Sequence, residues 1–237
     1  ACLRPPKEGK AGEPRWSPGG DIKVVASNDA GEVWGEPRTV YPQEAEGGIP
    51  KVIANRALPL TGEKGPAGRL VLPFWRERAR GARPAPRCPS ALGPEGDRAA
   101  GSSGVLISDD GGKSWAPHGL VADPAGATWL IEGSVAETAS GDLIMLLRSA
   151  ADTVWASRSE DGGLTWSTPE PTSLPNPNSK VSVIKLLGRW GGTLMAALNH
   201  HPRLRGPHSR TRSRLSLAAS GDGGRSWVVV AWLEEAM

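Results

Sequence analysis

The chain has 237 residues and a formal net charge of +3, which is too small to demand a polyanionic partner such as a nucleic acid. Its 31 glycines and 22 prolines favour short strands and many turns over long helices. Two cysteines provide neither a disulfide framework nor a metal site, and every apolar run is far shorter than the roughly 18 residues of a membrane-spanning helix. No signal peptide is visible in this chain, which leaves the compartment undecided, secreted and lumenal locations included.

Four copies of the pattern Ser-x-Asp-x-Gly-x-x-Trp punctuate the chain. They cover residues 27–34, 108–115, 159–166 and 220–227. Each copy follows an apolar or alternating run, which is typical of a β-strand. A pattern that recurs in this way indicates a repeated supersecondary unit, so we expect a repeat fold.

The segment before the first copy predicts fewer strands than the segment before the second copy. Residues 22–26 form one short strand before the first copy and leave no room for two inner strands. Residues 56–60 and 68–74 predict a lead-in strand and an apolar inner strand before the second copy. Residues 76–103, rich in Arg, Pro and Gly, are expected to be a mobile insertion between strands.

The third unit is the clearest. Residues 134–138 alternate weakly, residues 143–147 are wholly apolar as in a strand buried on both faces, and residues 153–157 precede the third copy. A last short strand ends at the prolines that follow Trp166. These segments predict a four-stranded antiparallel meander of about 40 residues, which is the size of a propeller blade.

The fourth unit repeats this order. Residues 181–186 are the lead-in strand, residues 192–198 match the apolar strands at 68–74 and 141–147, and residues 200–214 form a second insertion. We therefore predict an all-β fold, a β-propeller of three whole four-stranded blades and the outer half of another.

All of residues 1–237 are expected to form one incomplete propeller domain. Its blades are predicted at about residues 21–40 (partial), 52–120, 130–171 and 178–233. Uncovered apolar blade faces are unfavourable by about 25 cal/mol per Å². We therefore expect further blades before Ala1 and after Met237; an open arc or pairing with a second copy are the alternatives.

The motif has the chemistry of a hairpin turn between the third and fourth strands of a blade. Its Asp accepts bonds from backbone N–H groups ahead of it, its Gly supplies a positive φ, and its Trp covers the hairpin. We expect these residues to be structural: Asp29, Asp110, Asp161, Asp222, Trp34, Trp115, Trp166 and Trp227. A calcium site at each Asp is the alternative, but the motif lacks the additional carboxylates that a hard cation prefers, so no metal is expected.

The motif resembles the Asp box, or BNR repeat, of the sialidase (neuraminidase) superfamily over nearly all of residues 21–233. The resemblance implies a sialidase-type propeller, which has six blades in the family. The stretch Asn176-Pro177-Asn178-Ser179 and the later Asn199 match a further feature of sialidase-like proteins. Asp boxes also occur in unrelated propellers, so they are specific for fold and weak for activity.

A second segment resembles sialidases more specifically. It runs from Glu132 through Gly141 and Leu143 to Arg148, in the form Glu-x-x-Val-x-Glu-x-x-x-Gly-x-Leu-x-x-x-x-Arg. The resemblance implies that Arg148 belongs to an arginine triad on the substrate carboxylate, and that Glu132 activates a tyrosine nucleophile. Arg offers a fixed charge and a bidentate fork for a carboxylate. A neutral tyrosine avoids the repulsion that an anionic nucleophile would meet at an anomeric centre bearing a carboxylate.

Each of these residues also has a simpler interpretation. Arg148 ends an apolar strand where its head can reach solvent, and Glu132 can be a solvated residue at a strand start. Asn199 occupies the place of Arg148 in the next blade, so we expect it in the same pocket. Asn178 is a further candidate, although Asn-Pro-Asn is also ordinary turn chemistry. Glu77 follows the equivalent strand of the preceding blade and is a candidate for the same funnel.

Glu137 lies in the opposite register and is expected to be structural. Other parts of the family site have no match. No Arg occupies an early Arg-Ile-Pro context, and no acid/base Asp loop is found. Tyr41 is the sole tyrosine, and its place on an outer strand argues against a nucleophile. Arg189, Arg203 and Arg205 are candidates for another triad Arg without a motif behind them. The chain by itself is thus expected to be inactive.

Three functions remain open at this point. The first is a sialidase-like exo-glycosidase, a glycoside hydrolase that binds a sialoside or another acidic carbohydrate and uses no metal or organic cofactor. The second is a catalytically silent propeller that binds glycans or a protein. The third is an anionic-polymer site at residues 203–214, which hold five Arg and His208 but no aromatics for base stacking; a solvated insertion is the simpler interpretation.

Overall fold

The computed structural model describes residues 3–4, 15–16, 20–46, 48–62, 64–77, 101–204, 206 and 211–234. The chain divides into two compact units, one from Ala1–Ile53 and Arg76–Ala100, the other from Ala54–Trp75 and Gly101–Met237. Most of the first predicted insertion (78–100) and part of the second (205 and 207–210) lie outside the described residues. The grouping of residues 1–237 into one propeller domain stays a prediction.

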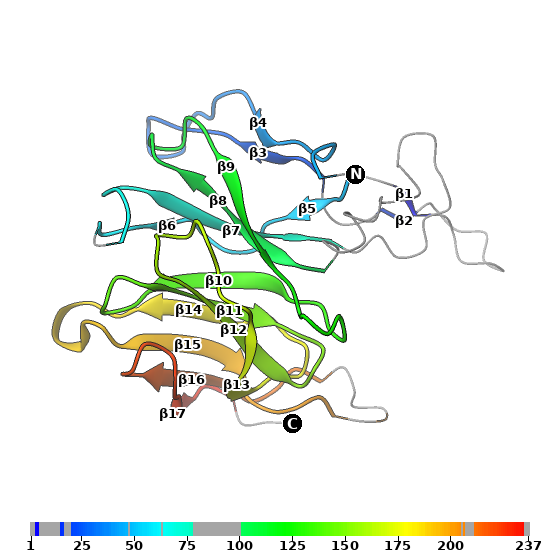
Figure 1. Ribbon diagram of the computed structural model, residues 1–237, viewed down its shortest axis with the longest axis vertical. Helices are drawn as coiled ribbons and strands as arrows, with labels where there is room; N and C mark the ends of the chain where they lie inside the picture. Colours follow the sequence, from blue (N-terminus) through cyan, green and yellow to red (C-terminus); the bar gives the residue numbers. More distant parts are fainter. Residues whose placement is uncertain are drawn as a thin grey trace. The chain divides into compact units, whose positions relative to one another are not determined.

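The first unit holds short strands (Figure 1, dark blue to cyan). They are β1 (Leu3–Arg4), β2 (Arg15–Trp16), β3 (Ile22–Val24), β4 (Arg38–Tyr41) and β5 (Lys51–Val52). β1 pairs with β2 and β3 with β4, both antiparallel, and the first Asp box connects β3 to β4. Lys51 is 2% exposed. Its ammonium group donates hydrogen bonds to the carbonyls of Pro42, Gln43 and Ala45 and thereby stabilises the turn after β4.

The second unit consists of antiparallel sheets whose strands follow one another in chain order (Figure 1). The first of them contains β6 (Leu58–Pro59), β7 (Leu70–Arg76, whose Arg76 is counted with the first unit), β8 (Ser103–Ser108) and β9 (Ala116–Val121). The next contains β10 (Ile131–Glu137), β11 (Leu143–Arg148), β12 (Thr153–Ser159) and β13 (Glu170–Pro175). The last contains β14 (Ser182–Lys185), β15 (Leu194–Asn199), β16 (Leu215–Ser220) and β17 (Val228–Trp232), with the 3-10 helix η1 (Gly188–Trp190) before β15. These sheets confirm the all-β prediction with four-stranded antiparallel blades.

Strand β11 explains how the sheets stack. Successive side chains of a strand point to opposite faces. Ile144 and Leu146 join a core with residues of β14–β16, whereas Leu143, Met145 and Leu147 join a core with residues of β7 and β8. All five side chains are fully buried, so this uninterrupted apolar run is a strand covered on both faces, as the sequence predicts.

The four Asp boxes share one hydrogen-bond pattern. In the boxes of the second unit, the second glycine N–H donates to the serine hydroxyl at 2.8 Å, and the aspartate accepts the N–H four residues ahead at 2.9 Å. Each serine hydroxyl also donates to its aspartate. Hydrogen bonds from Ser114, followed by that from Ser108, hold the pKa of Asp110 well below its usual range. These carboxylates are occupied by turn hydrogen bonds.

The box tryptophans differ in exposure. The indole N–H of Trp115 donates to Gly112 and that of Trp166 to Gly163, both at 3.0 Å, so each ring closes over its own turn. Trp34 in the first box is 58% exposed, and Ala30 there holds a φ of +59° where the other boxes have glycine. The first box is therefore the least covered of the four.

We predict that Ser159→Ala lowers the free energy of unfolding by about 1–3 kcal/mol, because the buried Gly163 N–H loses its acceptor. Urea unfolding followed by tryptophan fluorescence measures this change. Glu160→Ala, an exposed substitution in the same box, is the control and should stay near the parent value. Equal stability of the two variants would contradict a structural role for the box.

Candidate functional site

Glu132, Arg148 and Asn178 form one hydrogen-bonded cluster in the second unit. The Arg148 Nη1 donates to Glu132 Oε1 at 2.9 Å, and its Nε donates to Asn178 Oδ1 at 2.9 Å. The side chains of Arg148 and Glu132 are 16% and 17% exposed. The structure therefore brings three of the predicted residues together, in an ion pair that is partly shielded from water.

The backbone prepares this geometry. Arg148 is the last residue of β11, and its Cα partner on β10 is Ile131, next to Glu132. The register shifts between Ile131 and Ser134, and Glu132 has a φ of +54°. A non-glycine residue rarely adopts this conformation, and an irregularity of this kind redirects a side chain at the end of a strand.

Asn55 supports the shifted segment and was not predicted from the sequence. Its Nδ2 donates to the carbonyls of Glu132 and Gly133, at 3.1 and 2.8 Å. These bonds hold the strained turn in place from a segment 77 residues earlier in the chain. Such a distant contact leaves no local signal in the sequence.

Two further atoms of the cluster have no hydrogen-bond partner in the part of the chain that the structure describes. The Oε2 of Glu132 is buried and has no hydrogen-bond partner among the described residues. The Nη2 of Arg148 likewise has none there. An unpaired carboxylate oxygen and an unpaired guanidinium nitrogen lie on the same pair of side chains, which can accept from a hydroxyl and donate to an oxyanion.

Arg212 is a second cationic side chain beside the cluster. Its Nη2 donates to the Asn178 carbonyl at 3.3 Å, while Arg148 binds the side chain of the same residue. In the sequence, Arg212 is one of several arginines of the Arg-rich insertion at residues 200–214. Arg212 lies shortly before β16, which pairs with β15. This closeness to a blade strand is the feature of the sequence that could have distinguished Arg212 from the other arginines of the insertion.

Arg203 also lies near the end of β11. Its Nη2 donates to the Ala150 carbonyl at 3.0 Å. Arg189 lies over the Trp190 ring, 5.4 Å from its centroid, and makes no hydrogen bond with the cluster. Arg205 lies outside the described residues. Among the candidates without a motif, Arg203 is therefore the one placed beside the segment that follows Arg148.

The remaining predicted residues are not bonded to the cluster. Asn199 is the last residue of β15, as Arg148 is of β11, but its Nδ2 donates to the Ser213 carbonyl at 3.0 Å. Glu77 belongs to the first unit, and its place in the funnel stays a prediction. Glu137 is buried, accepts from the Thr61 hydroxyl at 2.7 Å and lies 3.9 Å from Lys185, contacts that suit a structural residue.

Tyr41 has none of the features of a nucleophile within its own unit. It is the last residue of β4 and is 5% exposed. Burial, followed by its hydrogen bond with Glu46, raises the pKa of its hydroxyl far above the usual value. Arg76 pairs with the same Glu46 at 2.6 Å. This tyrosine is therefore buried in the interior of its unit.

In the described ranges, no three His, Cys, Asp or Glu residues lie close enough together to hold a metal ion. Nor does any helix found there have the length and apolar character needed to cross a membrane.

We predict that Asn178→Gly frees the Arg148 side chain, because glycine keeps the positive φ of +61° but removes the acceptor. The Arg148 Nε–H should then exchange faster with water in ¹⁵N NMR spectra, at least about tenfold for a loss of about 1.4 kcal/mol. The Nε–H of the exposed Arg189 serves as the control and should not change. Unchanged exchange at Arg148 would contradict this contact.

Comparisons with known proteins agree with this fold. The BNR repeat-like domain family matches residues 11–237, whereas no curated protein sequence matches the chain. The NanB sialidase of Streptococcus pneumoniae has a similar structure, with a TM-score of 0.61 and 18% identity over 84% of this chain and 26% of its own. The intramolecular trans-sialidase of Ruminococcus gnavus has a TM-score of 0.62 and 19% identity over 87% of this chain and 38% of its own.

A protein of unknown function from Dyadobacter fermentans is also similar, with a TM-score of 0.57 and 20% identity over 89% of this chain and 52% of its own. The chain thus spans about a quarter to a half of the length of these structures. With nearly its whole length matched, the chain belongs to the BNR repeat-like domain family and has a sialidase-like fold.

Proposed function

We propose that this chain carries the carboxylate-binding part of a sialidase-like exo-glycosidase site, which hydrolyses terminal acidic sugars of the sialic acid type. The observation that carries the proposal is the Arg148–Glu132 pair with its unpaired Nη2 and Oε2 atoms. The structure of the Ruminococcus gnavus enzyme contains oseltamivir carboxylate, so a protein of similar fold binds a carboxylate ligand.

The chemistry assigns a separate task to each side chain. Arg148 would bind the sugar carboxylate through its free Nη2, while Glu132 and Asn178 hold the guanidinium in one orientation. Arg212 adds a second positive charge on the other side of Asn178. An anionic sugar is thereby favoured over a neutral one.

Glu132 is placed to act as a base. Its Oε2 is free to accept a proton from a hydroxyl, while Oε1 stays bound to Arg148. Sialidases use a tyrosine nucleophile, and a glutamate that accepts the phenolic proton would raise its nucleophilicity. The proposal assigns to this chain the Glu132 and Arg148 part of the site, and it assigns no nucleophile to Tyr41.

A glycan-binding propeller without hydrolysis is the second candidate function. It is favoured by Tyr41, the sole tyrosine of the chain, which is buried within the first unit. The same Arg148 pocket would then recognise an acidic sugar and leave it intact. The two functions share the binding step and differ only in turnover.

The binding step is tested with N-acetylneuraminic acid and the chain itself, by titration calorimetry. We predict that Arg148→Ala weakens binding by at least about tenfold. Removing one partner of a shielded charge pair, here the guanidinium that faces the sugar carboxylate, reduces the free energy of binding by about 2 kcal/mol or more. Arg189→Ala, which removes an exposed arginine outside the cluster, should bind like the parent. Equal affinities of the parent and Arg148→Ala would overturn the site assignment.

Release of the fluorophore from a fluorogenic sialoside separates the two functions. Turnover by the natural protein that Glu132→Gln abolishes would support the exo-glycosidase. Binding without turnover would instead support the glycan-binding propeller.

A further inference from the structure

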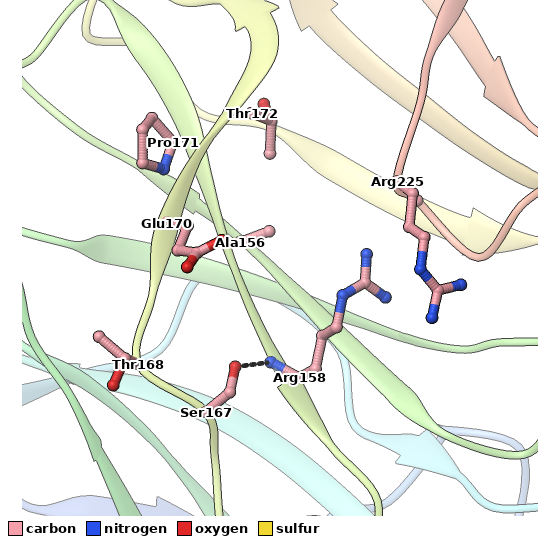
Figure 2. Close-up of a pocket in the computed structure, with 9 residues that line it drawn as sticks. Ala156, Arg158, Ser167, Thr168, Glu170, Pro171, Thr172 and Arg225 are labelled. Carbon is pink, nitrogen blue, oxygen red and sulfur yellow. Dashed lines mark hydrogen bonds between the residues drawn. The ribbon is translucent and has the colours of Figure 1, made fainter.

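A groove of about 510 Å³ lies in the second unit (Figure 2). It is lined by Ala156, Arg158, Ser167, Thr168, Glu170, Pro171, Thr172, Gly224 and Arg225. Arg158 pairs with Ile144 near the start of β11, whereas Arg148 ends that strand. At about 3.3 Å per residue, four residues separate the two positions by about 13 Å along β11. The groove is therefore a separate feature of the fold.

Arg158 has the same structural task as Arg69 but lacks its counterion. The Nη1 of Arg69 donates to the Gly162 carbonyl, and that of Arg158 donates to the Gly223 carbonyl; both glycines follow an Asp-box aspartate. Arg69 is neutralised by Asp109, with bonds of 2.7 and 2.9 Å. No carboxylate of the described residues lies within 4.0 Å of the Arg158 nitrogens. One of two similar arginines is thus left without a negative partner.

Arg225 brings a second positive charge to the same place. Its side chain is exposed, donates to the Asp222 carbonyl at 3.1 Å, and forms no ion pair with a described residue. Figure 2 shows the guanidinium groups of Arg158 and Arg225 extending toward each other. Burial, followed by the positive charge of Arg225, lowers the pKa of Arg158, and the more distant carboxylates of Asp222 and Asp142 offset this only in part. The two cations therefore repel each other across the groove.

The nearest carboxylates are engaged elsewhere. Asp142 accepts from Ser140 at 2.7 Å and pairs with Lys64 at 3.2 Å. Asp222 accepts from the Ser220 and Ser226 hydroxyls within its own Asp box. An oxyanion between the two guanidinium groups would relieve the repulsion, because two arginine forks suit a carboxylate or sulfate.

The other residues that line the groove offer hydrogen-bonding groups and apolar surface, as a sugar-binding site requires. The Thr168 hydroxyl has no hydrogen bond with a described residue, and the exposed Glu170 carboxylate can accept from ring hydroxyls. Ala156 and Pro171 provide apolar surface beside them. The volume falls in the range of about 300–1,000 Å³ that is usual for small-ligand sites. A hydroxylated ring with one anionic group matches this combination.

We propose that the Arg158–Arg225 groove is a second carbohydrate-binding site, which takes the carboxylate- or sulfate-bearing unit of an acidic glycan. The oxyanion lies between the two guanidinium groups, and ring hydroxyls contact Thr168 and Glu170. The site holds one sugar unit of a glycan, and it requires no turnover at the Arg148 cluster.

Titration calorimetry of the chain with four probes tests this proposal. The probes are D-glucuronate, glucose 6-sulfate, neutral glucose and inorganic sulfate. We expect one or both acidic sugars to bind at least tenfold more tightly than glucose and than inorganic sulfate, and the stronger of the two identifies the preferred oxyanion. Acidic sugars that bind no better than glucose would overturn the site, and inorganic sulfate that binds as tightly would overturn its assignment to carbohydrate.

Arg225→Gln is the decisive variant, because this exposed side chain contributes one hydrogen bond within its own turn. It should weaken binding of the preferred acidic sugar at least tenfold with an unchanged melting temperature, whereas Arg189→Gln, which changes an exposed arginine outside both sites, should leave that binding unchanged. If Arg148→Gln weakened binding of the acidic sugar and Arg225→Gln did not, the ligand would lie at the Arg148 cluster and the second site would be refuted.

Glu170→Gln is expected to increase affinity. A misfolded variant would lose affinity, so a gain cannot be caused by misfolding. Removing a negative charge from the groove, while keeping an amide oxygen that can accept from ring hydroxyls, should raise the affinity for the acidic sugar relative to glucose about two- to fivefold. An unchanged ratio of the two affinities would show that no anion enters the groove.

Discussion

In the three Asp boxes of the second unit, the hydrogen bond from the second box glycine to the box serine is the contact on which the sheets depend. It closes the hairpin between the last two strands of each four-stranded sheet, and in three boxes the serine is almost fully buried. The same turns also meet the neighbouring sheet. A Cβ on Gly224 would overlap the Ile144 side chain, and one on Gly162 would lie 2.6 Å from the Lys64 carbonyl. Glycine is therefore required both for its positive φ and for the close approach of adjacent sheets.

This stacking explains why the chemistry gathers at strand ends. β11 is covered on both faces, so its interior positions are apolar and only its ends can carry charge. One end places Arg148 against Glu132, and the other lies beside Arg158 on the adjacent strand. In the first case the protein supplies the counterion, and in the second the counterion is absent from the described residues. A rigid sheet thereby holds two arginines in fixed positions, which favours recognition of anions.

Local sequence signals were sufficient for the repeat and for part of the site. The turn residues of the Asp boxes and the apolar run of β11 act over a few residues, so their periodicity predicts the sheets. Glu132 and Arg148 are 16 residues apart but lie on adjacent antiparallel strands. Because one hairpin connects these strands, the contact can be expected from the sequence of a single segment. The family resemblance of this segment supplied the rest of that prediction.

Contacts between distant segments could not be predicted. Asn55 reaches the carbonyls of Glu132 and Gly133 from the segment before β6, and Glu132 has a positive φ at this point. Arg158 and Arg225 line one groove because the Asp box between β16 and β17 accepts a hydrogen bond from Arg158 of β12. Their isolated positions in the sequence give no sign of a shared groove.

The central claim is that Arg148 binds the carboxylate of an acidic sugar through its unpaired Nη2, while Glu132 and Asn178 hold its guanidinium. A crystal structure of the chain soaked with N-acetylneuraminic acid tests it most directly. The account predicts the sugar carboxylate within hydrogen-bond distance of the Arg148 guanidinium, with Glu132 still bound to the same side chain. Well-ordered ligand elsewhere, with Arg148 bonded only to Glu132 and Asn178, would contradict it.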